Sequence, residues 1–171
     1  GRGDLAVIGG PSVTLLWGDG SGAFPEMTAL VLPPVGDILA IRAADLDGDG
    51  ALELVAAALP QTMTGAARVV VLARVKGERE FRAAGDFSIP LRWPADIVAH
   101  DLNDDGRVDL LFTSFIGDSP QLLLGSASEE AAFEDPVPLL GPNVLYVTAG
   151  DFDRDGASDI AATGGYPGNL R

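Results

Sequence analysis

The chain repeats one acidic segment three times, and this repetition limits the folds open to it. Three ten-residue segments align without gaps: DLDGDGALEL at 45–54, DLNDDGRVDL at 101–110 and DFDRDGASDI at 151–160. The first five residues, GRGDL, fit the end of the same segment. Its glycine recurs at Gly1, Gly50, Gly106 and Gly156, with spacings of 49, 56 and 50 residues. Such a period indicates a repeat protein built from units of about 50 residues.

Four apolar runs of strand length follow one another in each period. The first run follows the acidic loop, and the second follows a turn. A polar hairpin that ends in Phe24, Phe81 or Phe133 comes after the second run, and the last run of the period leads into the next acidic loop. The clearest runs are 5–8, 13–17, 38–44, 54–59, 69–73, 96–100, 110–115, 122–124, 144–149 and 160–162. None has the length and capping of a helix. Four short strands per period are typical of a propeller blade.

We therefore expect an all-β fold made of β-propeller blades, each of four antiparallel strands. The repeats are approximately 1–36 and 143–171, which are partial, and 37–92 and 93–142. These repeats hold about thirteen strands, or about three blades, whereas closed propellers usually have four to eight blades. Because three blades alone would leave strand edges and blade faces uncovered, we expect the chain to be part of a larger propeller. The remaining blades would come from the same chain or from other copies.

The acids of each loop occur at alternating positions, which suits a hard cation. Counting from the first acid, side-chain oxygens stand at positions 1, 3, 5 and 9, with glycine at position 6. Two carboxylates about 4 Å apart repel by roughly 4 kcal/mol at an effective dielectric constant near 20. Calcium takes six to eight oxygen ligands, whereas magnesium keeps fewer protein ligands, and zinc prefers cysteine and histidine. An Asx-rich surface turn is the plainer alternative, but its recurrence in phase favours Ca²⁺ as the cofactor.

The charge of the chain excludes some partners. The formal net charge is −14, and the three loops hold four acids each, twelve of the 25 acidic residues. A polyanion disfavours nucleic acid and acidic membrane surfaces. No apolar run approaches the roughly 18 residues of a membrane span, so we expect no membrane insertion. Ten arginines against one lysine suggest a bacterial source with GC-rich DNA.

The loop pattern D-x-D-x-D-G-x-x-D, together with LLWGDGSGAF at 15–24, resembles FG-GAP/VCBS repeats. Those repeats build the seven-bladed propeller of integrin α subunits and occur in many bacterial secreted proteins. The resemblance implies calcium loops between the first and second strands of each blade. The Gly-Ala-Pro element of integrins is not evident, which favours a bacterial type. Glu53 replaces the usual Asp at position 9 and is longer by one methylene, so we expect the first complete site to be looser. Asn103 lowers the formal charge of the second site.

The resemblance also implies a ligand set for each loop, made of the side chains at positions 1, 3, 5 and 9 and the carbonyl at position 7. The set of the first loop is Asp45, Asp47, Asp49, the Ala51 carbonyl and Glu53, that of the second is Asp101, Asn103, Asp105, the Arg107 carbonyl and Asp109, and that of the third is Asp151, Asp153, Asp155, the Ala157 carbonyl and Asp159. The partial loop at residues 1–4 retains the Arg2 carbonyl and Asp4.

We expect a calcium-stabilised scaffold for adhesion or interaction, located outside the cell or on its surface, and not an enzyme. Extracellular modules bind calcium with dissociation constants of about 10⁻⁴–10⁻³ M, which is useful only in millimolar calcium. The ligand would be a protein or a glycan. The alternatives are a propeller attached to, or itself acting as, a secreted hydrolase or lyase, and a lectin-like module in which Trp17 and Trp93 stack on a sugar. His100 stands alone, and the tripeptide at 2–4, RGD, aligns with 107–109 as part of the repeat.

Overall fold

The structure, a computed structural model, describes residues 3–62, 65–75, 78–127 and 132–164. Within these ranges it contains thirteen β-strands and no helix, so none that could span a membrane. The strands are β1 (Leu5–Gly9), β2 (Ser12–Trp17), β3 (Glu26–Ala29), β4 (Ile38–Ala44), β5 (Glu53–Ala58), β6 (Ala67–Arg74), β7 (Phe81–Ile89), β8 (Pro94–His100), β9 (Asp109–Ser114), β10 (Gln121–Leu123), β11 (Val137–Pro138), β12 (Val144–Gly150) and β13 (Asp159–Gly164).

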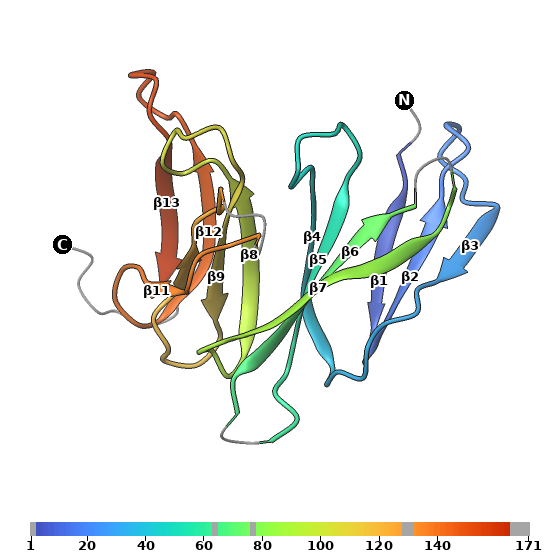
Figure 1. The fold of residues 1–171 in the computed structure, drawn as a ribbon, viewed down its shortest axis with the longest axis horizontal. Helices are drawn as coiled ribbons and strands as arrows, with labels where there is room; N and C mark the ends of the chain where they lie inside the picture. Colours follow the sequence, from blue (N-terminus) through green and yellow to red (C-terminus); the bar gives the residue numbers. More distant parts are fainter. Residues whose placement is uncertain (1–2, 63–64, 76–77, 128–131, 165–171) are drawn as a thin grey trace.

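The strands form four antiparallel sheets that follow the order of the chain (Figure 1). They are β1-β2-β3, β4-β5-β6-β7, β8-β9-β10-β11 and β12-β13, and every strand pairs with its neighbour in sequence. Strand β4 contacts β8, and β8 contacts β12, so the first strands of successive sheets lie next to one another. The predicted all-β fold of antiparallel sheets is confirmed, and the arrangement agrees with a segment of a propeller.

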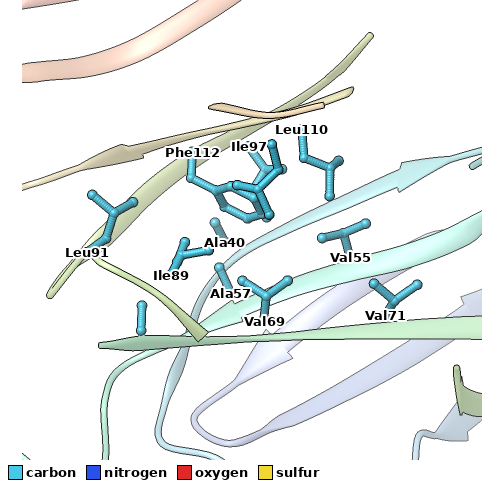
Figure 2. Close-up of a cluster of buried hydrophobic side chains, with 12 residues drawn as sticks. Ala40, Val55, Ala57, Val69, Val71, Ile89, Leu91, Ile97, Leu110 and Phe112 are labelled. Carbon is cyan, nitrogen blue, oxygen red and sulfur yellow. The ribbon is translucent and has the colours of Figure 1, made fainter. Parts of the chain in front are cut away.

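The core lies between the faces of neighbouring sheets rather than inside any one sheet. Figure 2 shows the cluster between the β4–β7 sheet and the β8–β11 sheet, where Phe112 and Ile97 oppose Val55, Ala57 and Val69. Burying one such large side chain stabilises the fold by about 1.5–3 kcal/mol. These interfaces therefore hold the sheets together.

The burial of strand β5 on both faces explains why its sequence does not alternate between apolar and polar residues, as that of a half-exposed strand does. Its even-numbered residues, Leu54, Ala56 and Ala58, pack toward the β1–β3 sheet, whereas Val55 and Ala57 pack toward the β8–β11 sheet. Both faces are covered, so all six residues of β5 are buried. A strand covered on both faces is expected to have a continuous apolar sequence.

The two end sheets expose positions that the inner sheets bury. Leu5 and Val7 of β1 are 47% and 46% exposed, whereas Leu54 and Ala56, which follow the next loop in the same order, are buried. At the other end Phe152 is 57% exposed, although the matching Leu46 packs against the core. Each outer face therefore carries side chains of the kind that a neighbouring sheet covers elsewhere in the molecule.

Candidate metal-binding loops

The three acidic loops join the first strand of a sheet to the second. They connect β4 to β5, β8 to β9 and β12 to β13, and they lie on the same side of the molecule, at the top in Figure 1. The second and third loops touch, because the Ser158 hydroxyl donates a hydrogen bond to the Asp101 carbonyl at 2.8 Å. The fold thus gathers these loops at one end.

The backbone takes the same course in all three loops. Positions 4 and 6 have positive φ angles each time, at Gly48 (75°), Asp104 (58°) and Arg154 (67°), and at Gly50 (85°), Gly106 (85°) and Gly156 (94°). A side chain at position 6 would meet nothing within 4 Å, so the dihedral angle and not space explains the glycine there. The repeated sequence therefore specifies one repeated loop conformation.

Position 4 offers a test of this backbone, because it holds Gly48 in the first loop and Arg154 in the third. A left-handed conformation costs a residue with a β-carbon roughly 1 kcal/mol or more, and glycine avoids this cost. We expect Arg154→Gly to raise the free energy of unfolding, measured in urea, by about 0.5–1 kcal/mol. Arg154→Ala removes the same charge but keeps the β-carbon, so it should give no gain. An equal gain from both variants would show that charge, not strain, is responsible.

The acids at positions 1, 3 and 5 hold the loop through backbone N–H groups. In the first loop the Asp45 carboxylate accepts hydrogen bonds from Gly48 N at 2.8 Å and Gly50 N at 3.0 Å. Asp47 and Asp49 each accept one from the residue two positions ahead, at 3.1 and 2.7 Å. The same kinds of bond recur in the other two loops. These contacts fix the direction in which the side chains at positions 1, 3 and 5 point.

Two opposing effects, desolvation and hydrogen bonds from backbone N–H groups, act on the pKa of the Asp101 carboxyl. Partial desolvation raises its pKa, but N–H groups of the loop, those of Gly106 and Asp105 foremost, lower it by more, so the pKa lies below its usual value. The loop thus stabilises the charged form of its own first acid.

The acid at position 9 closes each loop. Glu53, Asp109 and Asp159 accept a hydrogen bond from the backbone N–H at position 2, at 2.8, 2.8 and 2.9 Å. Asp109 is fully buried, and its other oxygen accepts from Gly125 N at 2.8 Å. Asp4 makes the matching bond to Gly18 N at 2.9 Å. Sequence reasoning missed this link from the loop to the segment just after a later strand, β10 for Gly125 and β2 for Gly18.

Among the described residues, the first complete loop makes no such second link, and the residues at the two ends of the link differ from those in the other sheets. From the pairing of β5 with β6, Arg74 stands where the other sheets have Gly18 and Gly125. A β-carbon at Gly18 would lie 1.9 Å from the Gly3 carbonyl oxygen, so the close approach needs glycine. Glu53 keeps the bond to position 2, and its pKa is raised by burial first and then by the charges of Asp47 and Asp45.

Two of the loops bring three carboxylates together. Ligand oxygens of Asp45, Asp47 and Asp49 lie within 4.8 Å of one another, and so do those of Asp151, Asp153 and Asp155. Among the described residues, the position 9 acids and the second loop do not form such a group. Each triplet offers the oxygen donors that a hard cation prefers, so both could hold a metal ion.

The FG-GAP-like repeat family matches residues 1–56 and 101–162, more than half of the chain. The chain belongs to this family. The matched ranges include all three complete loops, and the predicted family is confirmed. The comparisons with curated proteins and with solved structures found no match.

The structure places the other predicted residues of the FG-GAP repeats as follows. Ala51, Arg107 and Ala157 stand at position 7 of their loops, and their carbonyls stay predicted ligands. Arg2 lies outside the described residues, so the tripeptide at 2–4 is only partly described. Because the Asp4 carboxylate accepts the Gly18 N–H, it contributes to the fold in the same way as Asp109.

The two tryptophans of the segment have different surroundings. Trp17 is buried in the interface of the first two sheets, where its Nε1 donates to Thr28 Oγ1 at 2.9 Å and the Arg79 guanidinium lies 5.1 Å from the ring centre. Trp93 is 41% exposed. A buried ring cannot stack on a sugar, so the structure gives no support to a platform formed by both.

Proposed function

We propose that this FG-GAP repeat segment is part of a calcium-stabilised propeller that serves as an adhesion or interaction scaffold outside the cell. The carboxylate triplets of the first and third loops carry the proposal. One carboxylate oxygen of Asp49 and one of Asp155 accept a hydrogen bond from a backbone N–H. No donor among the described residues reaches the other oxygen of either side chain. A divalent cation would offset the repulsion among these acids and use the free oxygens.

The residues that would hold calcium are the acids at positions 1, 3 and 5, joined by the carbonyl at position 7 and the acid at position 9. When bound, the ion would supply positive charge at the centre of the loop. The chain's own acids hold the turn between the first and second strands, so the cation would reinforce a connection that the amide contacts already shape. This is a structural role rather than a catalytic one.

The exposed outer faces support a larger assembly. Leu5 and Val7 occupy positions that another sheet covers elsewhere in the chain. We propose that further blades, from the same chain or from other copies, cover these faces. A rigid ring of this kind would present its loops to a protein or a glycan.

Thermal unfolding in chelator and in millimolar calcium tests the proposal. At a concentration ten times the dissociation constant, calcium adds about 1.4 kcal/mol per site. For a chain of this size that corresponds to a rise in Tm of about 3–6 °C per site. We expect Asp47→Asn to abolish the part of this rise in Tm that calcium binding to the first loop contributes.

Two controls separate a site from general screening of the negative charge. Asp104→Asn neutralises an acid at position 4, outside the triplets, and should leave the calcium-induced rise unchanged. Magnesium at the same concentration should raise Tm less than calcium does. Equal Tm values in chelator and in calcium would contradict the proposal, as would equal losses from the two variants.

A further inference from the structure

The second loop differs from the other two at positions 3 and 7. Position 3 is Asn103 in place of Asp47 and Asp153, and position 7 is Arg107 in place of alanine. The first change removes a negative charge, and the second adds a positive one. Positions 1, 3 and 5 therefore carry a formal charge of −3 in the first and third loops, and of −2 in the second, where Arg107 contributes +1.

The Arg107 guanidinium lies against the acid at position 5. Its Nη2 is paired with Asp105 Oδ2, and its Nε donates to the Gly125 carbonyl at 2.7 Å. The Asn103 amide also donates to Asp105 Oδ2, at 2.9 Å, while Asp105 Oδ1 accepts the Arg107 N–H at 2.9 Å. Both oxygens of Asp105 are therefore engaged by the chain itself.

In the part of the chain that the structure describes, the matching acids of the other loops accept hydrogen bonds through one carboxylate oxygen only. Asp49 Oδ1 accepts from Ala51 N at 2.7 Å, and Asp155 Oδ1 accepts from Ala157 N at 2.8 Å. Within the described part of the chain, their Oδ2 atoms have no hydrogen-bond donor. The oxygen that Arg107 and Asn103 occupy in the second loop is thus available in the first and third.

The arginine is held in place from outside the loop as well. Gly125 accepts its Nε–H and leaves room for its stem, because a β-carbon at residue 125 would lie 2.9 Å from Arg107 Cβ. A hydrogen bond between a guanidinium and a carboxylate is stronger than a neutral one. A cation entering this loop would have to displace that pair, whereas it meets no such competitor at Asp49 or Asp155.

We propose that Arg107 is the built-in cation of the second loop, so that this loop closes without metal and calcium binds at the first and third loops. The proposal rests on the proposed function for those two loops. It names the residue that decides which FG-GAP loops of this chain take the metal.

Isothermal titration of the 171-residue chain with calcium tests the proposal. We expect two sites in the unchanged protein, three in Arg107→Ala, and one in Ala157→Arg, which moves the arginine to the third loop. Arg154→Ala is the matched control, since it removes the same charge from a position outside the triplets and should keep two sites. Three sites of similar affinity in the unchanged protein would overturn the proposal, as would a folded Arg107→Ala variant that still binds two.

Two further readouts keep the outcomes separate. If Arg107→Ala fails to fold, Ala157→Arg decides, because retention of its second site overturns the proposal and loss of that site supports it. In chelator, Arg107→Ala should lower Tm, since Asp105 loses its partner, and calcium should restore part of the loss. Absence of calcium binding to every variant would contradict the proposed function instead, and an unchanged Tm in chelator would then overturn the role of Arg107.

Discussion

Phe112→Ala is expected to lower the free energy of unfolding by about 3–5 kcal/mol. Phe112 is fully buried in β9 and lies in the interface between two sheets, so its removal leaves a cavity that neither sheet can close alone. Urea denaturation followed by circular dichroism measures the change. Because that interface joins the second and third sheets, the loss should appear in the unfolding of both.

Phe115 provides the matched control for this substitution. It is the residue that comes directly after the end of β9, and its side chain is 50% exposed. Phe115→Ala should change the free energy of unfolding by less than about 0.5 kcal/mol, as is usual for surface substitutions. If the two variants lost similar stability, the packing of sheet against sheet would not be the main source of stability.

Asp109→Ala is expected to cost about 2–5 kcal/mol, even in the absence of calcium. The Asp109 side chain is fully buried and accepts the N–H groups of Leu102 and Gly125. Alanine would leave both donors without a partner, and each unsatisfied buried donor costs about 1–3 kcal/mol. The measurement is urea denaturation in chelator, so that any contribution from a bound cation is excluded.

Asp104→Asn is the control for the loss of one negative charge in the same loop. Asp104 stands at position 4, is exposed, and asparagine tolerates its positive φ angle. We expect it to retain the stability of the unchanged protein. Should the loss from Asp109→Ala disappear in chelator, the acid would act through a cation alone, and the role assigned to its two amide contacts would be wrong.

The repeated part of the structure could be predicted from the sequence because its signals are local. The apolar runs gave strands close to their observed bounds, and the shared D-x-D-x-D-G-x-x-D pattern gave one loop conformation three times. The glycine at position 6 follows from its own φ angle. These features need no knowledge of distant contacts.

The remaining features depend on contacts between separate parts of the chain, and they escaped prediction for that reason. The link from Asp109 to Gly125 joins residues 16 positions apart across a strand pair. The burial of Trp17 depends on the neighbouring sheet, whereas Trp93 lies outside that interface. In hindsight one signal was present, since Arg74 breaks the pattern of Gly18 and Gly125 in the sheet where Glu53 replaces aspartate.

A crystal structure grown in millimolar calcium, with anomalous scattering data, tests the central claim most directly. We expect anomalous peaks inside loops 45–53 and 151–159, with carboxylate oxygens about 2.3–2.6 Å from each peak, and Arg107 still paired with Asp105 in the loop between them. Loops without peaks, with their carboxylates turned apart into solvent, would contradict the claim that these acids are gathered for a cation.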